Sequence, residues 1–474
     1  MIILGTNSIK DTGYDVANSY RSNSGDSPKL SKTFSSASNS NTTFTVSAWV
    51  KRSKLGANQD VVSAFQSSSG KQTDLIRFGS GDDLEFYAHT TNSSGNADIQ
   101  TNRLFRDVGA WYHIVVRVDT TQGTDTNRVR IYVNGVQETS FSTSNYMSQN
   151  GTIIWGLGSG TEHTIGAVGT SNYFGGYVAE VVYLDSQSVA PTTFGEFDED
   201  SGIWKPIDVS GLTFGNNSFY LDFENSAELG TDASGNSHTF TENNIVATDQ
   251  SIDTCTNNFG TLNPLNSWGG AVLSEGNLKL ASTATAFDHT SATIHMNSGK
   301  WYMEFNQVAT SGGSAVACFL AGTGEFQNDQ TSWISSGDGA FGIGMNGFKI
   351  TDGVEEGSPS FSAVSSGDIV QIAYDSDTGK AWFGINNSWL ASGNPSTNAN
   401  PYFTSSKLQN NDVSLKLITY TSNNTSIANF GQDSSFAGTK TKQSNQDSNS
   451  QGNFFYSPPT DFLALNTKNL AEYG

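Results

Sequence analysis

The chain has 474 residues but only two cysteines, Cys255 and Cys318. Two are too few for the disulfide framework that stabilises small secreted domains. One bridge between them and two buried free thiols both remain open, and the second is favoured. No apolar run reaches the roughly 18 residues that a membrane-spanning helix needs, so we expect no membrane insertion. The first residues, MIILGTNSIK, lack the long apolar stretch and the basic leader of a signal peptide.

Basic side chains are also scarce. The chain holds 24 Lys and Arg against 45 Asp and Glu, which gives a net charge of -21. Phosphate repels such a surface, so we expect no nucleic-acid partner. An acidic surface suits an extracellular or particle-surface protein, and its carboxylates can hold Ca²⁺.

Hydrophobic side chains alternate with a period of two along much of the chain. In residues 44–51, Phe44, Val46, Ala48 and Val50 share one face, and residues 112–119 repeat the pattern. Alternation of this kind predicts half-buried β-strands. Asn134-Gly135 separates two such runs and predicts a hairpin, because both positions of a type I′ turn need positive φ.

No segment carries a convincing helical stripe, and there is no heptad pattern. The prediction is therefore an all-β chain of two tandem antiparallel β-sandwich (jelly-roll) domains, with a short linker and a C-terminal tail. The predicted boundaries are residues 1–210 for the first sandwich, 211–254 for a connecting segment, 255–435 for the second sandwich, and 436–474 for a linker and tail.

The first predicted domain resembles laminin-G-like jelly rolls of the concanavalin A type. The resemblance rests on four motifs in the family's order. They are FTVSAWVK at 44–51, WYHIVV at 111–116, IYVNGV at 131–136 and FGGYVAEVVY at 174–183. Ala179 stands where that family often has Asp.

The second predicted domain resembles a SPRY domain. GKWYMEF at 299–305 is similar to the opening strand of that family, GDIV at 367–370 with residues 375–383 to its central strands, and ANFGQ at 428–432 to its terminal strand. The family binds partners through loops at one end of its sandwich.

The whole arrangement resembles virion proteins of tailed bacteriophages, through NSYR at 18–21, FGEF at 194–197, GIWKP at 202–206 and NPL at 263–265. That resemblance implies a fibre, spike or capsid decoration on the virion surface. It implies capsid or tail proteins as partners and host cell-surface carbohydrate as a ligand. Phage fibres are commonly homotrimers, although no three-fold core is encoded here.

The sequence gives no sign of an enzyme. The paired carboxylates that a glycosidase needs are not present as a single-strand motif, and Glu180 and Asp185 are five residues apart, on opposite faces of a strand. No histidines have metal-ligand spacing. His113 falls on the polar face of its strand, where a cross-strand surface role is expected.

Candidate ligand-binding residues are aromatic side chains in polar loops, because a sugar ring stacks on a flat ring. These residues are Trp155, Tyr173, Trp333 and Trp389. Packing in the core is the favoured alternative for any one of them. Asp232, Asn236, Asp375 and Asp377 are the candidates for Ca²⁺, with ordinary turns as the favoured alternative.

Three functions follow from these observations. The preferred one is a non-enzymatic virion surface protein that makes weak multivalent contacts with host glycans. The second is a structural cement or decoration protein without a ligand. The third, a glycan depolymerase, is the least favoured because the paired carboxylates are missing.

Overall fold

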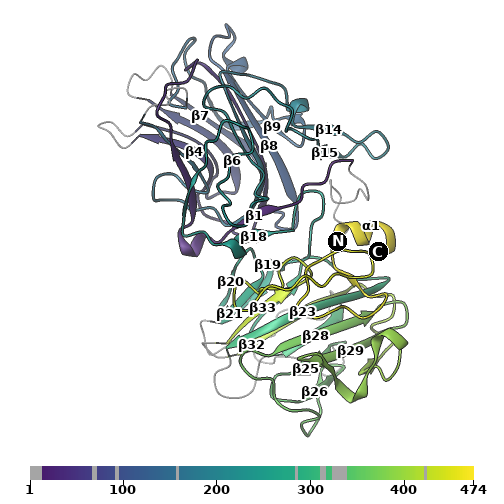
Figure 1. Cartoon of the computed structure of the whole chain (residues 1–474). Helices are drawn as coiled ribbons and strands as arrows, with labels where there is room; N and C mark the ends of the chain where they lie inside the picture. Colours follow the sequence, from purple (N-terminus) through teal and green to yellow (C-terminus); the bar gives the residue numbers. More distant parts are fainter. Residues whose placement is uncertain are drawn as a thin grey trace. The chain divides into compact units, whose positions relative to one another are not determined.

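The computed structural model describes residues 13–66, 72–90, 96–155, 160–282, 287–309, 317–322, 339–420 and 424–474. They divide into two compact units, residues 13–256 and residues 257–474 (Figure 1). Each unit contains large antiparallel sheets, which confirms the predicted all-β fold.

The first unit contains two large sheets. The first sheet has the order β10-β9-β8-β3-β13-β1-β18, and β16 also pairs with β13. Its strands are β1 (Ser19–Ser22), β3 (Thr43–Arg52), β8 (Trp111–Asp119), β9 (Val129–Val133), β10 (Val136–Gln137), β13 (Gly176–Asp185), β16 (Phe219–Leu221) and β18 (Gln250–Ser251).

The second sheet of this unit has the order β11-β7-β6-β5-β4-β12-β2-β17. Its strands are β2 (Lys29–Thr33), β4 (Gln59–Gln66), β5 (Gln72–Phe78), β6 (Asp83–His89), β7 (Ala97–Leu104), β11 (Phe141–Asn145), β12 (Glu162–Ile165) and β17 (Thr241–Asn243). Phe44, Val46, Ala48 and Val50 lie in the core between the sheets, as the alternation predicted.

The predicted hairpin joins β9 to β10. Asn134 has φ 50° and Gly135 has φ 77°, which are the positive values that a type I′ turn requires. Gly135 also lies against Trp204, where a Cβ atom would be 2.3 Å from the indole ring. This position therefore needs glycine for two independent reasons.

The outer face of the first sheet is covered by the chain itself. Trp204 comes from β15 (Trp204–Pro206), which pairs with β14 (Gly195–Phe197), and it lies parallel to His113. His113 in turn stacks on Trp49, with ring centroids 4.6 Å apart. The expectation of a surface role for His113 is therefore wrong, because its side chain is 0 % exposed.

The segment 211–254, predicted to connect two domains, contributes β16, β17 and β18 to the two sheets of the first unit. The first compact unit accordingly continues to residue 256. These strands are two or three residues long, too short to show a hydrophobic period in the sequence.

The second unit has two further sheets, with the orders β19-β22-β32-β24-β25-β26-β27 and β20-β21-β33-β23-β28-β29-β30. The strands of the first of these are β19 (Leu262–Trp268), β22 (Phe287–Ala292), β24 (Ala317–Gly322), β25 (Phe341–Gly344), β26 (Lys349–Thr351), β27 (Val354–Glu355) and β32 (Val413–Tyr420). Those of the other are β20 (Ala271–Ser274), β21 (Lys279–Ser282), β23 (Lys300–Ala309), β28 (Ile369–Asp375), β29 (Lys380–Ile385), β30 (Ser388–Trp389), β31 (Phe403–Thr404), β33 (Thr425–Asn429) and β34 (Leu463–Ala464).

Helical structure in the described residues is short. The α-helix α1 spans Thr467–Tyr473, and 3₁₀ turns span Ser24–Asp26, Asp125–Asn127, Pro191–Thr193, Ala247–Asp249, Leu390–Ser392 and Pro395–Thr397. None of the helices in the described ranges has the length and apolar character needed to cross a bilayer. Cys255 and Cys318 are both buried free thiols.

The C-terminal residues belong to the second unit and form neither a loose linker nor a free tail. Phe436, Phe454 and Leu465 are 0 % exposed, and β34 pairs in parallel with β23. The carboxylate of Glu304 on β23 accepts the backbone N–H groups of Phe455 and Tyr456, both at 2.8 Å. A few apolar anchors and one buried carboxylate therefore fix a segment whose composition is that of a linker.

We predict that a chain ending at residue 435 loses the unfolding transition of the second unit. Each large apolar side chain removed from the core contributes about 1.5–3 kcal/mol, and a whole domain is stable by only about 5–15 kcal/mol. Differential scanning calorimetry measures this, and the control is a chain ending at residue 470, which lacks only the exposed residues 471–474. An unchanged second transition in the shorter chain would contradict the prediction.

Candidate functional site

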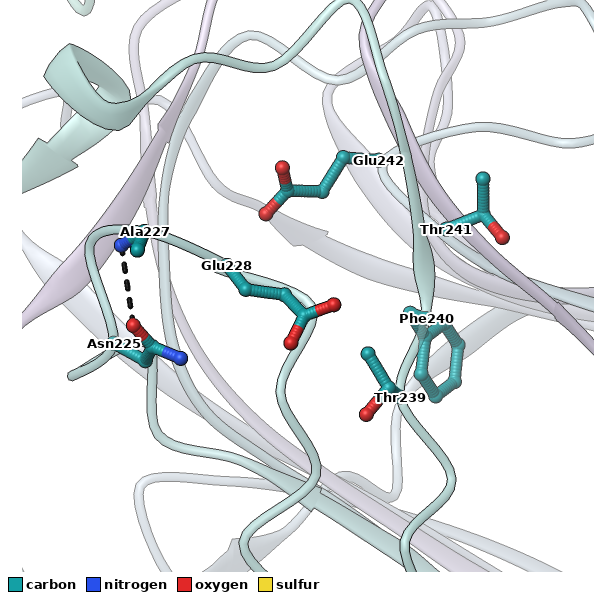
Figure 2. A pocket seen from close by; sticks show the side chains of 7 residues that line it. All are labelled: Asn225, Ala227, Glu228, Thr239, Phe240, Thr241 and Glu242. Carbon is teal, nitrogen blue, oxygen red and sulfur yellow. Dashed lines mark hydrogen bonds between the residues drawn. The ribbon is translucent and has the colours of Figure 1, made fainter.

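A pocket of about 620 Å³ opens at the edge of the first unit. One wall is the turn that contains Asn225, Ala227 and Glu228, and the other is the segment from Thr239 to Glu242. Figure 2 shows the side chains of Glu228 and Glu242 pointing into the space between these two walls. The pocket is the candidate functional site of the first unit.

The position of the second wall follows from strand pairing. Its last residues belong to β17, the edge strand of the second sheet, which pairs with β2 in the register Glu242↔Leu30. Leu30 is a core residue, so Glu242 lies on the side of the strand that faces the interior of the sandwich. Among the described residues, no further strand pairs with β17 on its other edge, so the interior of the sandwich is open to solvent at this end. A polar side chain is therefore accommodated there.

Hydrogen bonds hold the two walls together. The N–H of Gly230 donates to Glu242 Oε1 at 3.2 Å, and the N–H of Phe240 donates to the Gly230 carbonyl at 2.8 Å. A Cβ atom on Gly230 would lie 2.2 Å from the Phe240 carbonyl oxygen, so the close approach requires glycine. Asn225 closes the turn by accepting the N–H of Ala227 and donating to Thr231 Oγ1.

The groups that line the pocket are hydrogen-bonding rather than reactive. They include two carboxylates, the amide of Asn225 and the hydroxyl of Thr239. The ring of Phe240 is 1 % exposed and therefore offers no surface for a sugar to stack on. No Lys, Arg, His or Cys is among the residues that line this pocket. Such a lining can hold a hydroxylated or cationic ligand.

The aromatic candidates occupy different environments. Trp155 is 1 % exposed and lies 4.5 Å from Phe44 in the core, so the core-packing alternative describes it. Tyr173 and Trp389 are half-buried, and Trp389 packs over Gly384 of β29. Trp333 lies outside the described residues, so its role stays a prediction.

The candidate Ca²⁺ ligands are already engaged as turn residues. Asp232 accepts backbone N–H groups from Tyr220, Ser234 and His238. Asn236 donates from its amide nitrogen to the carbonyls of Gly215 and Ser218.

Asp375 and Asp377, the other Ca²⁺ candidates, likewise accept N–H groups, from Thr378 and Gly299. Within the ranges that the structure describes, no three His, Cys, Asp or Glu side chains are grouped so as to hold a metal ion. Ordinary turn chemistry accounts for these four residues.

Ser47 and His113 are in contact, but they do not form the nucleophile and base of a catalytic site. Ser47 Oγ lies 2.8 Å from His113 Nε2, while the indole N–H of Trp204 donates to His113 Nδ1 at 2.9 Å. Because Nδ1 accepts, the neutral ring carries its proton on Nε2 and donates it to Ser47. Burial lowers the pKa of His113 to about 3, which keeps the ring neutral. The ring therefore cannot act as a base toward that hydroxyl.

One buried carboxylate lies at a strained position of β13. Glu180 has φ 50° within a β-bulge against β3, and its side chain accepts hydrogen bonds from Tyr220 at 2.7 Å and Tyr14 at 3.3 Å. Burial raises the pKa of Glu180 to about 8, although the hydrogen bonds from Tyr220 and Tyr14 oppose this rise. Its side chain is enclosed, so it is a proton-binding structural group rather than an open site.

A second buried carboxylate, Asp60 on β4, lies opposite Arg77 on β5. Arg77 forms a two-pronged ion pair with Glu85 on β6, at 2.7 and 3.1 Å. Burial raises the pKa of Asp60 to about 7. Asp60 is 0 % exposed, so it offers no surface to a ligand.

Glu228 and Glu242 were not identified from the sequence. The segment that holds them was assigned to a connector, and its strand is too short for a period to show. The one feature of the sequence that marks this turn is the pair Leu229-Gly230. In the structure Leu229 is buried, and Gly230 lies so close to the backbone of Phe240 that no larger residue would fit.

Comparison with known proteins supports the fold of the first unit. Residues 26–187 match the family model described as the concanavalin A-like lectin/glucanases superfamily. No curated protein sequence matches the chain significantly.

Solved structures show only distant similarity. A human SPRY domain is 12% identical, with 34% of this chain and 94% of that one covered and a TM-score of 0.27. A heptameric SAP-like pentraxin from Limulus polyphemus is 16% identical, with 37% and 80% covered and a TM-score of 0.27. The sialidase carbohydrate-binding module CBM40 of Ruminococcus gnavus, bound to α2,3-sialyllactose, is 14% identical, with 29% and 72% covered and a TM-score of 0.22. These TM-scores are too low to support a functional inference.

We predict that Glu180 makes the first unit less stable as pH rises. The pKa of Glu180 is about 8 in the folded chain against 4.5 in the unfolded chain. The unfolded chain therefore loses this proton first, and the free energy of unfolding falls between about pH 4.5 and pH 8. The loss is on the order of 4 kcal/mol.

The test is urea unfolding at pH 5 and pH 8 for the wild type and Glu180→Gln. The glutamine cannot ionise, so the variant should lose less stability than the wild type between these pH values. Glu199→Gln, which removes an exposed carboxylate of the same unit, should behave as the wild type. Equal losses in all three proteins would show that Glu180 is ionised throughout.

Proposed function

We propose that this chain is a non-enzymatic glycan-binding protein, displayed on the surface of a tailed-phage particle, and that the pocket between Asn225 and Glu242 receives the glycan. The observation that carries the proposal is the pocket itself, lined by hydrogen-bonding side chains on a concanavalin A-like β-sandwich. Sugar hydroxyls donate hydrogen bonds to carboxylates and accept them from threonine hydroxyls.

Preorganisation supports binding at this place. The walls are already joined by the Gly230 to Glu242 and Phe240 to Gly230 hydrogen bonds, so little ordering is required when a ligand enters. A single shallow site of this kind binds weakly. Many copies on one particle would convert weak contacts into avidity.

A glycan depolymerase is the second candidate, because two carboxylates point into one pocket (Figure 2). A glycosidase uses one of its two carboxyl groups as a general acid, held protonated by apolar surroundings. Glu228 is exposed to solvent, and Glu242 accepts the N–H of Gly230. These environments favour a role in binding for both.

We predict that Thr239→Trp abolishes glycan binding by the intact chain on a glycan array. Thr239 lines the pocket and its side chain lies toward Glu228 (Figure 2), so a tryptophan at this position fills the space between the walls. Trp389→Ala, in the second unit, should bind as the wild type. Loss of binding in Trp389→Ala alone would instead place the site on the second unit.

Incubation with the bound glycan separates the two candidate functions. A non-enzymatic glycan-binding protein should bind the glycan without releasing reducing ends from it. Release that disappears in Glu228→Gln or Glu242→Gln would establish the depolymerase.

The virion location is supported by the sequence resemblance described above and by the acidic composition. We predict that mass spectrometry of purified phage particles detects this chain in multiple copies with capsid or tail proteins. A particle-bound chain that binds no glycan would support the role of a structural cement or decoration protein. A chain absent from particles would contradict the virion assignment.

A further inference from the structure

We infer that the pocket between Asn225 and Glu242 selects a glycan that carries a protonated amine, such as a glucosamine oligosaccharide, and rejects acidic glycans. This inference rests on the proposed glycan binding and names the class of ligand. It follows from the charges, the walls and the surroundings of the pocket.

The lining has negative charge and no compensating cation of its own. Glu228 and Glu242 come from opposite walls, and none of the seven residues that line the pocket is basic. A bound anion would therefore face two carboxylates. An ammonium group would gain charge-assisted hydrogen bonds, which are stronger than neutral ones.

Both nearby lysines on β2 already have oxygen partners. Lys29 Nζ donates to Glu162 Oε1 and to the Gly169 carbonyl, both at 2.8 Å. Lys32 Nζ donates to the carbonyl of Thr239 at 3.3 Å, on the backbone of one wall. Neither lysine is among the residues that line the pocket.

The two carboxylates have different roles in this arrangement. Glu242 is positioned by the Gly230 N–H on Oε1, which leaves Oε2 for a ligand. Glu228 has an exposed side chain on the turn that Asn225 closes, so it can adjust to the ligand. Thr239 adds a hydroxyl for the sugar ring. One fixed and one adjustable carboxylate can hold an amine while this hydroxyl orients the ring.

The experiment measures binding of the intact chain by isothermal titration calorimetry to three short oligosaccharides. These are a glucosamine oligomer, its N-acetylated counterpart and an oligogalacturonate. The expected order is tightest for the amine, about tenfold weaker for the acetylated sugar, as for loss of one charge-assisted hydrogen bond, and no binding of the uronate. Equal binding of the amine and its acetylated form, or tighter binding of the uronate, would overturn the inference.

Matched variants separate the pocket from the general attraction of a chain with net charge -21. Glu228→Gln and Glu242→Gln should each remove most of the preference for the amine, while Glu199→Gln should keep it. A preference that survives both pocket substitutions would come from surface charge and would refute the assignment.

The proposed function and this selectivity fail in different ways. Absence of binding to every sugar tested, the array glycans included, contradicts glycan binding itself. Binding to glycans without an amine preference leaves glycan binding intact and rejects the amine selectivity alone.

Discussion

Burial of both faces of one sheet is the constraint on which the first unit depends. The inner face of β3, β8 and β13 packs against the second sheet, and the outer face carries the parallel rings of Trp49, His113 and Trp204. The histidine at the centre of this stack is neutral, and hydrogen bonds to Ser47 and Trp204 satisfy both of its nitrogens. A charged ring there would be costly because no carboxylate is hydrogen-bonded to it.

This covering layer decides where the first unit can meet a ligand. The outer face of the first sheet is filled by residues that the chain supplies from 194–220 and from its segment near Cys255. Asp60, a carboxylate of β4 in the second sheet, is also enclosed. The open place described here is the edge of the sandwich at β17, where the loop from 225 to 231 stands away from the strand and leaves a pocket.

Features that repeat over many residues could be predicted from the sequence, and features that depend on a single contact could not. The alternation in residues 44–51 identified the core face, and Asn134-Gly135 identified the hairpin, because each reflects local backbone geometry. The alternation marked His113 as facing away from the core but not that β15 would cover it. The C-terminal segment has the composition of a linker, and only its tertiary contacts, such as those of Glu304 and the pairing of β34 with β23, show that it is fixed. Glu228 and Glu242 meet through tertiary structure and share no motif.

The central claim is that ligand recognition takes place at the edge pocket of the first unit and not at the loops of the second. Hydrogen-deuterium exchange of the intact chain, with and without a glycan found to bind, tests this most directly. The account requires new protection at backbone amides of residues 225–231 and 239–243, with the exchange of residues 386–400 unchanged. Protection confined to residues 386–400, with none at the pocket, would contradict it.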